Sequence, residues 1–120
     1  MGADGANQVS LGGRLVERSA LRHTPAGLPV LEFRIAHASR QIEAGLPRQV
    51  ECEATAVALG QTAEFLAAAP LGSAVAASGF LAARGLRSRQ LVLHVTNIEF
   101  LEGSEHGIQT QEQDGSQTQG

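Results

Sequence analysis

The chain has 120 residues, 42% of them apolar, so it can form one domain with a modest core but not two. No apolar run approaches the roughly 18 residues that span a bilayer, and the single cysteine allows no internal disulfide, so we expect a cytoplasmic protein without membrane association. The net charge is −3, but residues 7–101 hold all nine arginines against seven glutamates, which makes the body mildly basic and the ends acidic.

Both ends of the chain are rich in Gly, Gln, Ser and Thr and carry almost no apolar side chains. Such segments cannot bury enough surface to offset the entropy lost on ordering. We therefore expect a disordered N-terminus over residues 1–6, a folded domain over residues 7–102 and a disordered, acidic, Gln-rich tail over residues 103–120.

The folded body begins with two alternating runs. Val9 and Leu11 share one face of the first, and the pair Gly12-Gly13 interrupts it, which predicts a bulge or a sharp bend. Turn residues follow at positions 24–29. The next run, over residues 30–38, alternates strictly and predicts a half-buried strand.

A long exposed hairpin is predicted over residues 40–49, because Gly and Pro lie there between two alternating runs. The third run covers residues 50–59. Cys52 falls on its small, apolar side and is expected to be a buried hydrophobe. Glu51 and Glu53 fall on the opposite side, which we expect to face solvent.

The periodicity then becomes helical. Helix formers run from Ala63 to Ala69, with Thr62 as the expected N-cap and with Pro and Gly directly after the run. Two further strands are predicted at about 74–83 and 90–101. The order β-β-β-α-β-β predicts an all-β protein with one short helix, folded as a five-stranded OB-fold barrel. An SH3-like barrel is the alternative, but it normally lacks a helix at this position.

No residue pattern predicts catalysis. The sequence has no Gly-rich phosphate loop, no G-x-S-x-G and no H-E-x-x-H, and its four histidines lie in separate segments without metal-ligand spacing. We therefore expect no enzymatic activity, no metal and no cofactor. His37 and His94 each fall within a strand, where we expect a hydrogen-bonded structural imidazole.

Positive charge gathers between the last two strands. Arg84, Arg87 and Arg89 lie there, and no acidic residue occurs between Glu64 and Glu99, so we expect these arginines to lack carboxylate partners. In an OB-fold this loop borders the nucleic-acid face, and single-strand binders present such cationic surfaces. The alternative is a solvated loop that uses arginine for solubility. With the arginines of the long hairpin and the basic pair before the first turn, the candidate nucleic-acid-binding residues are Arg22, His23, Arg40, Arg48, Arg84, Arg87 and Arg89.

Three stretches, "LRHTPAGLPVLEF", "EAGLPRQVECEA" and "GFLAARGLRSRQLVLHVTNIEFLE", resemble the primosomal replication protein N group, relatives of bacterial single-stranded DNA-binding proteins. The resemblance extends over about residues 7–102. It implies an OB-fold homodimer that binds single-stranded DNA, associates with the replication-restart helicase and helps to load further primosome components. The family's basic positions are matched here by Arg22, His23, Arg48, Arg84, Arg87 and Arg89.

The sequence departs from this family in its aromatic residues. Glu51 stands where the family has a stacking tryptophan, Leu46 stands at a nearby aromatic position, and the last hairpin is about two residues shorter. Since base stacking contributes about 1–3 kcal/mol per base, we expect weaker and more salt-sensitive DNA binding. The alternative function is an OB-fold adaptor that binds the helicase and has little affinity for DNA.

Overall fold

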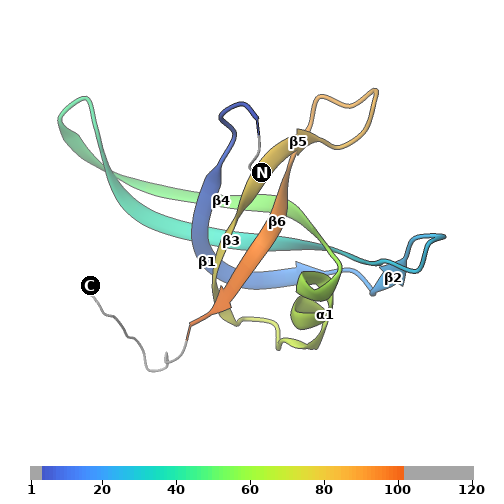
Figure 1. Cartoon of the computed structure of the whole chain (residues 1–120). Helices are drawn as coiled ribbons and strands as arrows, with labels where there is room; N and C mark the ends of the chain where they lie inside the picture. Colours follow the sequence, from blue (N-terminus) through green and yellow to red (C-terminus); the bar gives the residue numbers. More distant parts are fainter. Residues whose placement is uncertain (1–3, 102–120) are drawn as a thin grey trace.

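Six strands and one helix form over residues 4–101, the part of the chain that this computed structural model describes (Figure 1). The predicted tail over residues 103–120 lies outside this range, as do residues 1–3 of the predicted disordered N-terminus. Residues 4–6 are exposed and belong to no helix or strand. The elements are β1 (Val9–Arg18), β2 (Arg22–His23), β3 (Pro29–Glu43), β4 (Leu46–Leu59), α1 (Gln61–Ala68), β5 (Ala74–Ala83) and β6 (Leu91–Phe100).

Five of the strands close into a barrel because β1 pairs with two partners. Its first half, Val9–Arg14, pairs antiparallel with β5, and its second half, Arg14–Arg18, pairs antiparallel with β3. Strand β3 pairs with β4, β4 pairs in parallel with β6, and β6 pairs with β5, which closes the barrel. The two-residue β2 only adds an edge to β3. The predicted five-stranded OB-fold barrel is confirmed, and the SH3-like alternative is rejected.

The glycine pair in β1 marks the point where the strand passes from β5 to β3. Here the strand bends so closely over β3 that a Cβ on Gly13 would overlap the carbonyl oxygen of Ala36. The register shift lies further along, between Leu15 and Glu17. The bend predicted at the glycines is therefore confirmed, whereas a bulge at that point is wrong.

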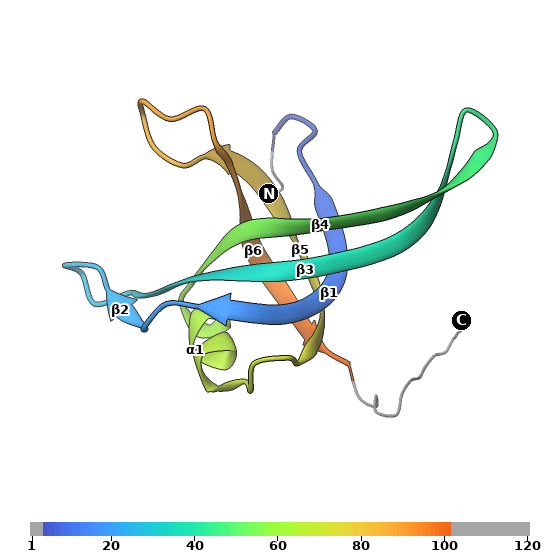
Figure 2. The same cartoon turned by 180° about the vertical axis from the view of Figure 1, so that it is seen from behind.

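Strands β3 and β4 continue past the barrel as a two-stranded ribbon, which we call the β3–β4 ribbon (residues 40–49; Figures 1 and 2). All ten of its residues are exposed, as predicted. Its strands are joined by a two-residue turn at Ala44 and Gly45, both with positive φ (53° and 80°), which is the geometry of a tight hairpin. Cys52, near the base of the ribbon, is also exposed, so its predicted burial is wrong. At that position the two strands have already left the core.

The core lies inside the barrel and under α1, which closes one end. The helix starts directly after Gly60, whose positive φ (72°) turns the chain sharply at the end of β4. Thr62 therefore lies inside the first turn and donates to the carbonyl oxygen of Thr96 (3.5 Å), so its prediction as N-cap is wrong. The buried cluster consists of Leu15, Leu31, Phe33, Ile35, Ala56, Ala58, Ala63, Leu66, Ala69, Val75, Ala77, Leu93 and Val95.

Candidate nucleic-acid interface

Two loops project from the same side of the barrel, opposite the β3–β4 ribbon (Figures 1 and 2). One is the β1–β3 connection, which carries Arg22 and His23 on β2, and the other is the β5–β6 loop (residues 84–90). Barrel closure thus brings together residues that are far apart in sequence. We call the basic residues on these loops the loop-side cluster: Arg22, His23, Arg84, Arg87 and Arg89.

Arg22 and Arg84 converge on one carboxylate. Arg22 Nη2 lies 3.0 Å from Glu32 Oε2, and Arg84 Nη2 lies 3.8 Å from Glu32 Oε1. The three side chains border a hollow of about 200 Å³ on the outer face of the barrel, together with Val57 and His94. Two cations against one anion leave this hollow with a net positive charge.

The expectation that Arg84 lacks a carboxylate partner is wrong. Glu32 lies on β3, outside the sequence window from Glu64 to Glu99, and the fold brings it beside the β5–β6 loop. The Arg84 and Glu32 side chains are 48% and 43% exposed, and pairs of this kind contribute only about 0–1 kcal/mol. An anionic ligand can therefore compete with Glu32 for the guanidinium group.

Arg87 and Arg89 are exposed residues of the β5–β6 loop. Within residues 4–101 neither lies within 4.0 Å of a carboxylate. Leu86, directly before Arg87, is fully exposed, so its side chain packs on nothing in the described structure. These two guanidinium groups therefore remain available to an external anion.

Other arginines have structural contacts instead. Arg14 donates to the carbonyl oxygen of Gly72 (2.9 Å), and Arg18 donates to the carbonyls of Leu66 and Ala69 at the end of α1. These bonds hold the chain around the helix. Arg14 and Arg18 thus differ from the loop-side cluster in having main-chain partners.

The remaining candidates, Arg40 and Arg48, lie on the β3–β4 ribbon. Arg48 pairs with Glu43 at 2.7 Å across the hairpin, whereas Arg40 forms no ion pair among residues 4–101. In Figures 1 and 2 the ribbon and the two loops lie on opposite sides of the barrel. The predicted residues are therefore not brought into a single cluster.

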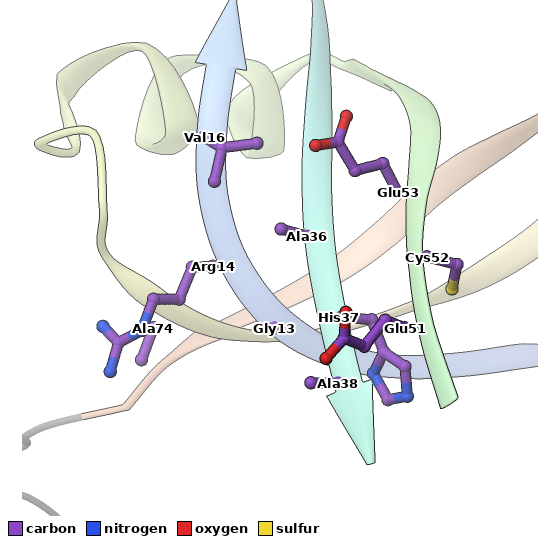
Figure 3. A pocket seen from close by; sticks show the side chains of 10 residues that line it. All are labelled: Gly13, Arg14, Val16, Ala36, His37, Ala38, Glu51, Cys52, Glu53 and Ala74. Carbon is purple, nitrogen blue, oxygen red and sulfur yellow. The ribbon is translucent and has the colours of Figure 1, made fainter. Parts of the chain in front are cut away.

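An acidic groove, lined by two glutamates and by Arg14, lies between the two basic regions. Figure 3 shows Glu51 and Glu53 of β4 projecting beside Ala36 and Ala38 of β3, in a groove of about 730 Å³ that Val16 also borders. The two glutamates face solvent, as predicted. Any polyanion that reaches from the loops to the ribbon along β3 and β4 passes these carboxylates, of which Glu53 pairs with Arg34 at 3.8 Å.

The two strand histidines differ from each other. His37 Nδ1 donates to the carbonyl oxygen of Gly12 (2.6 Å), and its Nε2 contacts Ser39 Oγ (2.8 Å), which confirms a structural imidazole. His94 forms no side-chain hydrogen bond within residues 4–101, so that prediction is wrong. Its ring instead stacks on Phe80 with 5.1 Å between centroids and 6° between planes.

Sequence reasoning missed both members of this stack. Phe80 and His94 each lie in a predicted strand, but their contact depends on the register between β5 and β6. A register shift between Ser78 and Gly79 moves the pairing by one residue and places Phe80 opposite His94. No signal in a single sequence fixes the position of such a shift.

Residues 4–101 contain no group of three or more His, Cys, Asp or Glu side chains that could hold a metal ion. The helix in the same range has eight residues and is too short to cross a bilayer.

Comparison with known proteins identifies close relatives. A family model described as "Another single-strand binding protein family" matches residues 7–97. Replication restart protein PriB of Bordetella pertussis is 45% identical over 98 residues, which cover 82% of this chain and 92% of that protein. PriB of Nitrosomonas europaea is 41% identical over 95 residues, which cover 79% and 88% of the two chains.

Two solved structures share the fold. PriB from Ralstonia solanacearum has a TM-score of 0.73 at 33% identity, covering 80% of this chain and 98% of that one. The single-stranded DNA binding protein from Thermus aquaticus has a TM-score of 0.69 at 29% identity, covering 86% of this chain and 53% of that one. The chain therefore belongs to the replication restart protein PriB family, within a wider group of single-strand binding proteins.

Proposed function

We propose that the protein is a single-stranded DNA-binding accessory factor of the replication-restart primosome, acting in the cytoplasm. The observation that carries this proposal is the loop-side cluster, in which Arg87 and Arg89 have no carboxylate partner among residues 4–101 and Arg84 has only a weak one. The names of the relatives support it, since they are replication restart and single-stranded DNA binding proteins. Its action is to recruit and stimulate the restart helicase on the bound strand.

The proposed mechanism is neutralisation of phosphates by guanidinium groups. Planar arginine forks suit phosphate oxygens, and contacts to the backbone position a strand without reading its sequence. Glu51 and Glu53 interrupt the path toward the β3–β4 ribbon, so the loop-side cluster is the main contact and the ribbon arginines Arg40 and Arg48 add to it only for longer strands. We expect the resulting affinity to be modest and dependent on salt.

Salt dependence tests this mechanism. If about four phosphates are contacted, the logarithm of the binding constant falls against the logarithm of salt concentration with a slope near −3. Fluorescence anisotropy of a labelled oligo(dT) at several salt concentrations measures the slope. A binding constant that does not change with salt concentration contradicts phosphate neutralisation. If the protein then still captures the purified helicase without DNA, the adaptor function replaces DNA binding. The acidic groove at Glu51 and Glu53 is the feature that favours this second function.

We further propose that the protein acts as a homodimer. One edge of Val9–Gly13 pairs with β5, but the other edge pairs with no strand within residues 4–101. An open strand edge is a template for another chain, and a second copy would pair with it through a two-fold axis. Light scattering is expected to give twice the 12.5 kDa mass of the chain. A monomer mass at micromolar concentration would exclude the dimer.

A further inference from the structure

One row of side chains crosses the outer face of four strands beside the loop-side cluster. Glu32 on β3 pairs with Val57 on β4, Val57 pairs with His94 on β6, and His94 pairs with Phe80 on β5. Since residues in register point to the same face of a sheet, these four side chains lie next to one another. The row therefore changes from acidic through apolar to aromatic.

The Phe80–His94 stack presents ring surface to solvent. Phe80 is 41% exposed, although a phenyl ring of this kind is normally buried. In this row His94 lies between Phe80 on β5 and Val57 on β4, and it borders the 200 Å³ hollow, which Val57 also lines but Phe80 does not. The hollow is thus lined by the aromatic side chain of His94, by apolar Val57, and by Arg22 and Arg84 with their partner Glu32.

Aromatic platforms are scarce in this protein. The chain has no Trp or Tyr and only four Phe, and Phe33 is buried in the core. Within residues 4–101, Phe80 and His94 form the one stacked pair of rings. Phe65 and Phe100 are exposed as well, but His94 is the ring that borders a hollow together with Arg22 and Arg84.

We propose that this hollow is a nucleotide subsite, in which one base stacks on the His94 ring and Arg22 and Arg84 contact the adjoining phosphate. Phe80 acts as a positioning residue, because it holds the imidazole in a fixed orientation. Glu32 pairs with both guanidinium groups in the free protein and competes with the phosphate for Arg84, which it releases when the strand binds. This inference rests on the proposed binding of single-stranded DNA and assigns to it a base-stacking position.

Leucine substitutions test the subsite, because they remove the ring but keep an apolar side chain. His94→Leu is expected to weaken binding of oligo(dT) about five- to twentyfold, in the lower part of the range for base–aromatic stacking, and Phe80→Leu about two- to fivefold. The salt dependence of the binding constant is expected to stay unchanged, since no phosphate contact is lost. The matched control is Phe65→Leu, which removes a phenyl ring from α1 that is 51% exposed, against 41% for Phe80, and is expected to leave binding unchanged.

Two further measurements separate stacking from a structural role. An oligonucleotide of abasic sites is expected to bind wild type and His94→Leu equally, because it offers phosphates but no rings. In the wild-type protein, the His94 ring protons are expected to shift upfield in NMR spectra when oligo(dT) is added, a readout that does not depend on how the variants fold.

The outcomes distinguish this inference from the proposed function. Equal binding of oligo(dT) by wild type and His94→Leu, with no shift of the His94 protons, overturns the subsite and leaves the DNA-binding function intact. Failure of wild type and of Phe65→Leu to bind any oligonucleotide overturns the DNA-binding function and the subsite together.

Discussion

Replacing Arg84, Arg87 and Arg89 together by alanine is expected to weaken binding of single-stranded DNA about thirtyfold or more at about 0.1 M salt. The three side chains supply most of the phosphate contacts that we propose. The plot of the logarithm of the binding constant against the logarithm of salt concentration should therefore become less steep, with a slope near −1 in place of −3. All three are exposed on one loop, and the melting temperature should therefore change little. Anisotropy titrations over a salt series, with circular dichroism melting of each variant, measure both effects.

A single substitution at Arg87 has a matched control at Arg14. Both changes remove one exposed guanidinium group, but Arg14 contacts the carbonyl oxygen of Gly72 and lies outside the loop-side cluster. Arg87→Ala is expected to weaken binding about fivefold and Arg14→Ala hardly at all. Equal losses from the two variants would show that net charge, and not the position of the arginines, controls binding.

Removal of the negative charge at Glu32 is expected to have the opposite effect on DNA binding. Glu32→Gln removes the carboxylate that pairs with Arg22 and Arg84, so binding should become a few-fold tighter. Glu64→Gln on α1 changes the net charge by the same amount at a residue that forms no ion pair among residues 4–101. If both variants bind alike, Glu32 does not compete with the strand.

The strands could be predicted because a half-buried strand exposes every second side chain. Leu31, Phe33 and Ile35 alternate in the sequence and are all buried in the barrel. The same rule failed for Cys52, since it assumes that a strand remains against the core along its whole length. Here β3 and β4 extend beyond the barrel, and alternation in the sequence does not indicate where a strand leaves the core.

The basic loop could likewise be predicted, but its surroundings could not. A window without acidic residues shows that no local partner exists, whereas Glu32 reaches Arg84 only through closure of the barrel. The Phe80–His94 stack depends in the same way on a one-residue register shift. Pairings between distant strands are set by tertiary packing, so the properties of a site that depend on them need the folded structure.

Strand β1 provides a second large expected effect, this time on stability. At Gly13 the strand crosses β3 so closely that an added Cβ would overlap the carbonyl oxygen of Ala36 and come within 2.8 Å of Ile35 Cγ2. Neither neighbour can move freely, because one is main chain and the other is a fully buried side chain. At Gly12, one residue earlier in the same strand, the nearest atom is the carbonyl oxygen of Val75 at 3.8 Å, an ordinary contact.

Gly13→Ala is therefore expected to lower the free energy of unfolding by about 3 kcal/mol or more, because the barrel must open at its bend to admit the methyl group. Gly12→Ala should change it by less than about 1 kcal/mol, since alanine fits there without strain. Urea unfolding at equal protein concentration, followed by circular dichroism because the chain has no Trp or Tyr, measures both values. Similar stabilities of the two variants would mean that β1 does not cross β3 at Gly13 as closely as the barrel requires.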